Sequence, residues 1–183
     1  MIEIQAPNDI PLNDKITVFL GGSIEMGTAE KWQAKMVHDL SYTDITFLNP
    51  RRDDWDWTWE QSINNPKFHE QVTWEQDAFE YSDIIIINFD PNTKSPISLL
   101  ELGLFAHTGN VIVCCPNGFW RKGNVDIICE RYNIPLVESY DALVDNVLKR
   151  YNILVGSNHV SDKGYSIGTK EAYDEFVKKR EVL

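Results

Sequence analysis

Glu101 stands in the part of this sequence whose residue types and spacing point most directly to chemistry. Residues 84–89 form a nearly continuous apolar run rich in isoleucine, typical of a strand buried on both faces of a parallel sheet. Residues 90–92 end that strand, and Ser98 is the expected N-cap of the next helix. Glu101 is then expected in the first helical turn, beyond the carboxyl end of a central strand, where ligands bind in open α/β sheets. Its carboxylate is either a catalytic group or a charge that mildly favours the helix dipole.

Gly21, Gly22 and Ser23 follow the first expected strand and precede a helix. Glycine lets a ligand approach the backbone closely, and N–H groups at a helix start favour an oxyanion or a hydroxyl. The same residues also suit an ordinary tight strand-to-helix turn. The next glycine is Gly27 and no acidic residue closes the second strand, so the pattern is not that of a dinucleotide site.

A tryptophan-rich segment follows the second expected strand and begins with Asn49, Pro50 and Arg51. The faces of Trp55 and Trp57 suit stacking on a flat heterocycle, and arginine can hydrogen-bond the edge of such a ring. The alternative is that these tryptophans cover the core or an interface. We expect at least one of them to face a ligand or a partner.

Two acidic residues, Glu75 and Asp77, lie on the helix expected before the central strand. Residues two positions apart point to different faces of a helix, so only one of them can readily reach a pocket. None of the four histidines has a partner at the spacing of metal ligands, and neither a metal nor a cofactor is expected. The sequence contains no nucleophile elbow and no Walker motif, which argues against a serine hydrolase or a P-loop enzyme.

The composition is that of one globular domain. The chain has 183 residues, 43% hydrophobic and 25% charged, and no apolar run near the roughly 20 residues that span a bilayer. The net charge of −11 opposes binding to nucleic acid or to anionic membranes. No signal peptide is apparent, and three cysteines without metal spacing favour a reducing cytoplasm.

Strands and helices alternate along the chain, which predicts a doubly wound, parallel α/β sheet. Five strands are expected at residues 15–20, 45–48, 84–89, 111–115 and 134–137. Helices are expected at residues 29–40, 68–81, 98–109, 125–132 and 141–151. A single domain is therefore expected, with residues 152–183 as a C-terminal extension that holds a loop and a last helix at residues 169–179.

Four segments together resemble the nucleoside 2-deoxyribosyltransferases and the related 2-deoxynucleoside 5′-monophosphate N-hydrolases. These segments are Val-Phe-Leu-Gly-Gly-Ser-Ile at residues 18–24, Asn-Pro-Arg at 49–51, Trp-Glu at 74–75 ahead of Ser-Asp at 82–83, and Ser-Pro-Ile-Ser-Leu-Leu-Glu-Leu-Gly at 95–103. The resemblance runs in order from about residue 15 to 147, and the Glu-Leu-Gly segment is its most specific part. It implies a flavodoxin-like sheet of five parallel strands and a homo-oligomer whose subunits complete each other's sites.

The resemblance also implies roles for the acidic residues. Glu101 is expected to attack the anomeric carbon of the sugar and form a covalent deoxyribosyl-enzyme. The family has an aspartate eight residues ahead of the aspartate that opens the central strand, and it contacts the sugar or helps protonate the base. Counting back from Asp83, that position holds Glu75, and Asp77 is the alternative on the same helix.

Other positions are assigned to substrate binding through the same resemblance. Phe19 stands where transferases often have an aromatic residue near the pocket, and Ser95 stands where the monophosphate hydrolases hold phosphate. Those hydrolases have arginine after Gly-Ser-Ile, whereas this chain has Glu25, which repels a 5′-phosphate and favours a nucleoside. Asn117 and Asn124 are candidates, by location, for binding the 5′-hydroxyl from a neighbouring subunit.

The leading hypothesis is a nucleoside 2-deoxyribosyltransferase that exchanges the base of a 2′-deoxynucleoside for a free nucleobase. The first alternative is an N-glycoside hydrolase that uses the same glutamate with water as the acceptor. The second is a nucleoside- or nucleotide-binding protein without turnover. A pure binding protein has no need of a buried nucleophile, so the pairing of Glu101 with Glu75 argues against the second alternative.

Overall fold

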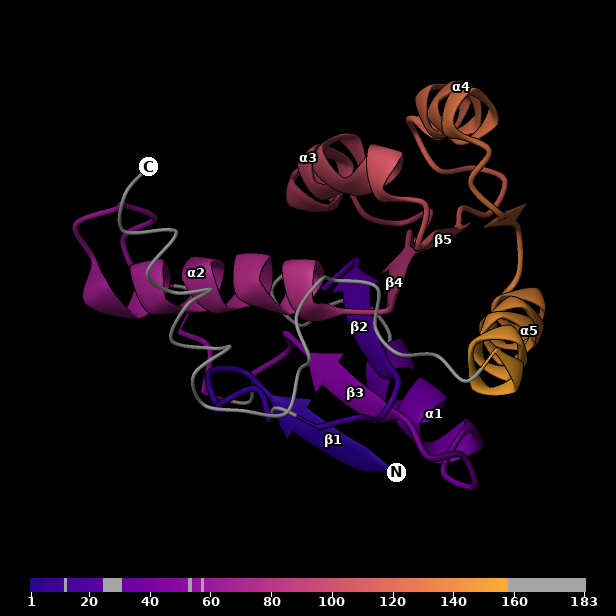
Figure 1. The fold of residues 1–183 in the computed structure, drawn as a ribbon. Helices are drawn as coiled ribbons and strands as arrows, with labels where there is room; N and C mark the ends of the chain where they lie inside the picture. The colour runs from indigo at the N-terminus through magenta and orange to yellow at the C-terminus, as the bar shows by residue number, and fades with distance from the viewer. Residues whose placement is uncertain (12, 25–30, 53, 57, 158–183) are drawn as a thin grey trace.

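A six-stranded parallel sheet runs through the centre of the structure, a computed structural model that describes residues 1–11, 13–24, 31–52, 54–56 and 58–157 (Figure 1). The strands are β1 (Ile2–Gln5), β2 (Thr17–Gly22), β3 (Thr46–Asn49), β4 (Ile84–Asn88), β5 (Val111–Cys114) and β6 (Leu136–Val137). Their order across the sheet is β1-β3-β2-β4-β5-β6, with every neighbouring pair parallel. The predicted doubly wound α/β fold is confirmed, with one strand more than expected.

The additional strand is β1, at the edge of the sheet. It pairs with β3 in a register that sets Ile2 beside Thr46 and Gln5 beside Asn49. Its four residues alternate between isoleucine and polar side chains, and its burial is only partial. So short and half-polar a segment gives a weak periodic signal, which is why the sequence analysis missed it.

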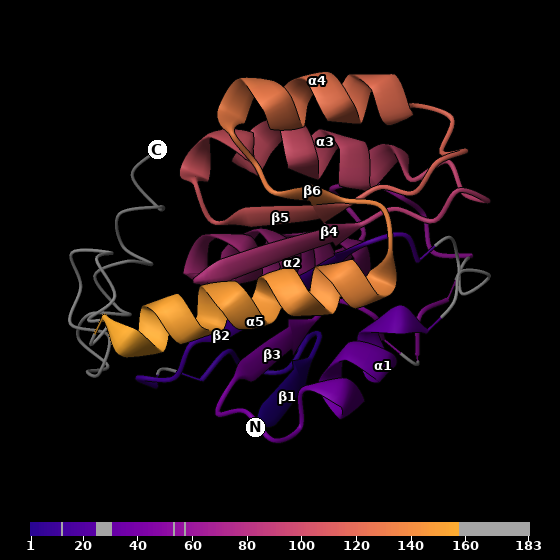
Figure 2. The same ribbon diagram turned by 90° about the vertical axis from the view of Figure 1, so that its right-hand side faces the viewer.

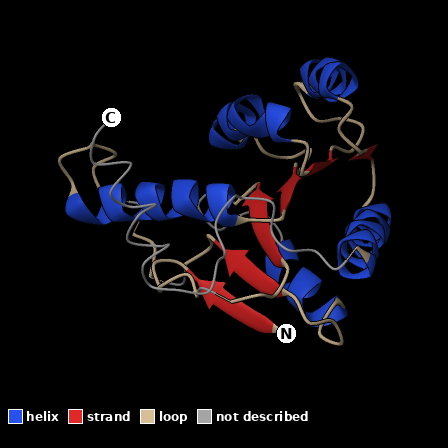
Figure 3. Cartoon of the chain, viewed as in Figure 1, coloured by secondary structure: helices blue, strands red, loops and turns tan. Residues whose placement is uncertain are grey.

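In the described part of the chain, five helices cover the sheet, as the alternation of elements predicts (Figure 3). They are α1 (Trp32–Asp39), α2 (Pro66–Tyr81), α3 (Pro96–Phe105), α4 (Lys122–Tyr132) and α5 (Tyr140–Gly156), and a short 3₁₀ turn, η2 (Ala106–Thr108), follows α3. Helices α1 and α5 lie on one face, and α2, α3 and α4 lie on the other (Figures 1 and 2). None of the helices in the described ranges is both long and apolar enough to cross a membrane.

Several helix ends differ from the sequence-based expectation. Helix α2 begins two residues early, because Asn65 caps its first N–H groups and Pro66 takes the first helical position. Helix α5 continues to Gly156, beyond the expected end at residue 151 and into the expected loop. The helix expected at residues 169–179 lies outside the described residues.

The core has two halves, one on each face of the sheet, and β4 supplies both. Ile85 and Ile87 pack with apolar side chains of α2, α3 and α4, whereas Ile84 and Ile86 pack with those of α1 and α5. All four isoleucines are fully buried. A strand covered on both faces needs apolar residues at every position, so the run that marked this segment follows from its central place.

Candidate functional site

Glu101 lies in the second turn of α3, one turn further from the helix start than the sequence suggested. The N-cap is Ser95, in a left-handed conformation at φ 44°, and Pro96 opens the helix with its preset backbone angle. Ser98, the expected cap, is a buried residue inside the helix. That expectation was wrong because the cap was chosen by residue type, without weight for Pro96 at the first helical position.

The environment of the Glu101 carboxyl group is dry and electrostatically unfavourable for a charge. Its side chain belongs to the buried residues, at 7% exposure. Burial and the nearby charge of Glu75 raise its pKa from 4.5 to about 8. A surface charge that merely complements the helix dipole would have an ordinary or lowered pKa. Of the two interpretations, this environment favours a functional group over a helix-dipole charge.

Glu75 on α2 supplies the second carboxyl group of the pair. Its Oε1 accepts a hydrogen bond of 2.8 Å from Gln71 Nε2, one helical turn earlier. Burial raises its pKa to about 7, although the hydrogen bond from Gln71 acts in the opposite direction. The charge of this residue is the one that acts on Glu101. Asp77 is partly buried on the same helix. Within the described ranges, no group of three or more potential ligands gathers as a metal site would require.

Three buried hydroxyl groups join the end of β2 to the start of α3. Ser23 Oγ lies 2.9 Å from Thr93 Oγ1 and 2.6 Å from Ser95 Oγ, and the last two oxygens are 2.7 Å apart. Ser23 Oγ also accepts from the backbone N–H of Asp90, while Thr93 Oγ1 donates to the carbonyl of Asp90. This hydroxyl triangle fixes the loop that precedes Glu101. Ser23 and Ser95, both predicted to bind substrate, therefore have partners inside the protein.

Gly22 permits a close approach, but to the neighbouring strand. Its φ is +135°, and a Cβ atom there would lie 2.2 Å from the carbonyl oxygen of Asn88. The N–H of Ser23 donates to the same oxygen at 2.8 Å. The turn after β2 is thus held against the end of β4, and this N–H is not available to an anion.

Side chains of β1, the strand that was not predicted, form hydrogen bonds with the end of β3 and the loop after it. Asn49 Nδ2 donates to the carboxylate of Glu3 at 2.8 Å, and its Oδ1 accepts from the N–H of Arg51. Gln5 Nε2 donates to the carbonyl of Arg51 at 2.6 Å. Asn49 is buried and Arg51 is partly buried. Both residues lie at the carboxyl edge of the sheet, as predicted.

The tryptophan-rich segment packs on itself and on Arg52. The rings of Trp55 and Trp59 are 5.1 Å apart, and the Arg52 guanidinium lies 5.2 Å from the Trp59 ring. Arg52 also forms a two-bond ion pair with Asp54, at 2.7 and 2.8 Å. Trp55 is partly buried. Trp57 lies outside the described residues, as does Glu25.

The remaining predicted residues are Phe19, Asn117 and Asn124. Phe19 is 1% exposed, and its ring packs 4.1 Å from that of Phe79 in the core beneath the site. Asn117 and Asn124 are exposed, on the loop after β5 and at the start of α4. Asn117 Nδ2 donates to Glu138 at 2.9 Å. Their expected role in a neighbouring subunit's site stays a prediction.

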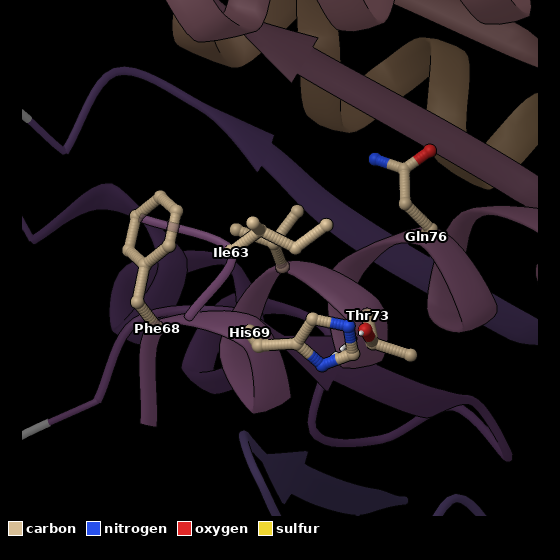
Figure 4. A pocket seen from close by; sticks show the side chains of 6 residues that line it. Ile63, Phe68, His69, Thr73 and Gln76 are labelled. Carbon is tan, nitrogen blue, oxygen red and sulfur yellow. Dashed lines mark hydrogen bonds between the residues drawn. The ribbon is translucent and has the colours of Figure 1, made fainter. Parts of the chain in front are cut away.

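An apolar hollow of about 400 Å³ lies on the outer side of α2, and Glu75 and Glu101 are not part of its wall. Figure 4 shows its lining, which consists of Ile63, Phe68, His69, Val72, Thr73 and Gln76. Ile63 is 79% exposed, so this hollow is a surface feature. The hollow is therefore separate from the site that contains Glu75 and Glu101.

Two comparisons with known proteins bear on this arrangement. A conserved protein from Enterococcus faecalis V583 of known crystal structure superposes with a TM-score of 0.53, covering 74% of this chain and 99% of that chain at 14% identity. That similarity supports the fold alone. No curated protein matches the sequence. The family model described as "Nucleoside 2-deoxyribosyltransferase like" matches residues 15–119, more than half of the chain.

The chain belongs to the nucleoside 2-deoxyribosyltransferase-like family. The matched region extends from the start of β2 past β5 and contains both carboxyl groups and the hydroxyl triangle. Members of a nucleoside 2-deoxyribosyltransferase-like family are related to enzymes that handle glycosidic bonds of nucleosides. The recognition made from four short segments is thereby confirmed.

Sequence reasoning missed three residues that hold this site together: Glu3, Gln71 and Thr93. Each acts through a hydrogen bond to a residue of the site or to its loop. Thr93 lies two residues before Ser95, and this short spacing of hydroxyl side chains was a usable signal. Glu3 and Asn49 are 46 residues apart, and no local pattern connects them.

Proposed function

We propose that this protein is a nucleoside 2-deoxyribosyltransferase in which Glu101 is the nucleophile and Glu75 is the proton donor. The observation that carries the proposal is the pair of carboxyl groups, a partly buried one from α2 and a buried one from α3, whose pKa values are raised to about 7 and about 8. A buried pair of this kind costs folding stability, which is typical of a functional site.

The reaction follows from two displacements at the anomeric carbon. A Glu101 carboxylate oxygen forms a bond to C1′ while the bond from C1′ to the base nitrogen breaks, and the leaving base takes the proton of Glu75. The nitrogen of a second base then attacks C1′, the ester bond to Glu101 breaks, and Glu75 takes back a proton from the incoming base. Two inversions give net retention.

The same pair allows the site to contain one protonated and one ionised carboxyl group at the same pH. Between pH 7 and 8 the two groups together retain about one proton, since their pKa values lie on either side of that range. Because the pKa of Glu75 is the lower of the two, the singly protonated pair mainly has Glu75 ionised and Glu101 protonated. The reactive form, with Glu101 ionised and Glu75 protonated, is the minor of the two singly protonated forms. Because the residues share a charge interaction, ionisation of one favours protonation of the other.

A homo-oligomer is part of the proposal, and α3 offers support for it. Ile97, Leu100 and Leu104 are 59%, 67% and 51% exposed and form one stripe along this helix. An exposed apolar stripe on the helix that carries the nucleophile suits contact with a second copy. Asn117 and Asn124 would then contribute to the partner's site.

Residues around the carboxyl pair are proposed to contact the nucleoside and to set its position. The carboxyl edge of the sheet carries Asn49, Arg51 and Trp55 after β3 and the hydroxyl triangle between β2 and α3. A nucleoside is favoured over a 5′-phosphorylated substrate by the acidic side chain at position 25.

The test is incubation of the protein with one 2′-deoxynucleoside and a different free base, followed by chromatographic resolution of the products. A new deoxynucleoside supports transfer, and release of free deoxyribose without it supports the hydrolase alternative. Glu101→Ala should abolish exchange, whereas Glu80→Gln, a change at an exposed position of α2, should leave it unchanged. An undiminished rate in Glu101→Ala contradicts the mechanism.

A further inference from the structure

The side chain of Gln71 has both of its amide hydrogens committed to the site. Gln71 is 2% exposed on α2. Its Nε2 donates to the backbone carbonyl of Pro50 at 2.9 Å and to Glu75 Oε1 at 2.8 Å. A side-chain amide has two donor hydrogens, so these bonds use its full donor capacity.

The amide oxygen of Gln71 points to a cation. Arg52 Nη1 lies 3.5 Å from Gln71 Oε1, and the guanidinium is held by Asp54 and lies 3.7 Å from Glu70. With donors on one side and an acceptor on the other, only one orientation of the amide satisfies all three neighbours. The loop after β3 therefore contacts Gln71 twice, through the carbonyl of residue 50 and the guanidinium of residue 52.

Glu75 has one charged group of like sign near it, Glu101, and one cation, Arg52, on the far side of Gln71. Glu101 approaches from α3 with a like charge, and Arg52 acts from the loop across the amide of Gln71. Gln71 is the donor that favours the ionised form of Glu75, against burial. A hydrogen bond to an ionised group is among the stronger kinds, so its loss should be measurable.

We propose that Gln71 is a positioning residue that fixes the carboxyl group of Glu75 to the loop after β3 and sets how readily this group gives up its proton. The catalytic role of the Glu75 proton rests on the proposed function. The placement of the Glu75 carboxyl group by Gln71 does not. Movement of the loop would weaken the bond from Gln71 to Pro50 and reorient the donor to Glu75. Gln71 thus links the position of the loop after β3 to the position of the Glu75 carboxyl group.

The test compares Gln71→Met, similar in shape but without donors, with Gln76→Met, whose side chain lines the hollow on the outer side of the same helix. The titration of the Glu75 carboxyl carbon is followed by ¹³C NMR in the full chain, with Glu75→Gln used to assign the signal. We expect the midpoint of Glu75 to rise by about one pH unit in Gln71→Met and to stay unchanged in Gln76→Met. An unchanged midpoint in folded Gln71→Met overturns the proposal.

A second variant keeps the test decisive should Gln71→Met not fold. Gln71→Leu also removes both donors and is close in size to glutamine, so the midpoint should rise as in Gln71→Met. A midpoint equal to that of the unchanged protein again overturns the proposal. The pH profile of kcat/KM for base exchange should move upward with the NMR midpoint. A shifted midpoint in a protein without exchange activity contradicts the proposed function and leaves the positioning role intact.

Discussion

Glu75 on α2 and Glu101 on α3 lie close enough for the charge of the first to raise the pKa of the second. The two residues come from helices separated by β4, which places α2 and α3 side by side on one face of the sheet (Figure 1). Glu101 is buried and Glu75 is partly buried, and each carboxyl group is more weakly acidic than in water. The protein thus maintains two groups that exchange protons near neutral pH.

The pH dependence of base exchange should be bell-shaped. Below about pH 7 both carboxyl groups are protonated and Glu101 cannot attack, whereas above about pH 8 neither retains the proton that the leaving base needs. We expect kcat/KM to be greatest between these values and to fall about tenfold per pH unit well outside them. Initial rates from pH 5 to 10 would measure this, and a rate that keeps rising to pH 10 would contradict the assigned proton donor.

Replacing the Glu101 carboxyl group should stabilise the fold at high pH. Its pKa is raised in the folded state from 4.5 to about 8, so the native protein binds more protons than the unfolded chain across that range. The free energy of unfolding therefore falls as pH rises from about 4.5 to 8. Glu101→Gln has no carboxyl group to ionise at this position. Its free energy of unfolding should exceed that of the unchanged protein by roughly 2–4 kcal/mol at pH 9, and the two values should be similar at pH 4.

Urea unfolding at several pH values measures this difference. Glu130→Gln, at an exposed position of α4, is the control and should follow the unchanged protein at every pH. Equal stability of Glu101→Gln and the unchanged protein at pH 9 would show that the carboxyl group is not held in an unfavourable environment.

Two glycine substitutions should have opposite effects on stability. In Gly22→Ala the new Cβ atom would meet the backbone of Asn88 at 2.2 Å, at a φ of +135° that alanine rarely adopts. We expect a loss of about 3 kcal/mol or more. In Gly103→Ala, inside α3, the Cβ atom meets nothing within 4 Å, and a gain of up to about 1 kcal/mol is expected. Thermal unfolding of both variants would check this, and a stable Gly22→Ala would contradict the close packing of β2 on β4.

The hydroxyl triangle should be sensitive to the loss of one member. Thr93→Val removes the group that contacts both serines and the carbonyl of Asp90, which leaves buried polar atoms with fewer partners. We expect it to cost about 1–3 kcal/mol, whereas Thr93→Ser should cost less than about 1 kcal/mol because the hydroxyl remains. Chemical denaturation measures both. Equal losses in the two variants would indicate that the methyl group, and not the hydroxyl, matters at this position.

The parts of the fold that sequence could predict are those with a strong local signal. The isoleucines of residues 84–87 marked β4, because a central strand needs apolar residues on both faces. The four residues of β1 gave no such signal, since an edge strand exposes half of its side chains. The start of α3 was misplaced because Ser98 is a good capping residue by type. Pro96, which favours the first helical position, was the signal for Ser95 as the cap.

The site was predictable to the extent that it lies at the carboxyl edge of neighbouring strands. This rule placed Glu101, Ser23 and Asn49 together. It could not predict that Gln71 would join Glu75 to the loop after β3, because this contact depends on how α2 is rotated against the sheet. Nor could it separate Glu75 from Asp77, since both choices fit a helix and only the position of Glu101 distinguishes them.

The place of β1 at the edge of the sheet has a consequence for how the chain assembles during synthesis. Its partner strand β3 lies more than forty residues further along, and β2, which comes between them in sequence, pairs on the other side of β3. Residues 2–5 therefore leave the ribosome long before any surface exists for them to join. These residues remain unpaired until β3 has formed. The hydrogen bond from Asn49 to the carboxylate of Glu3 can form only after that pairing. The rim of the site is thus completed by a pairing between two segments that are synthesised at different times.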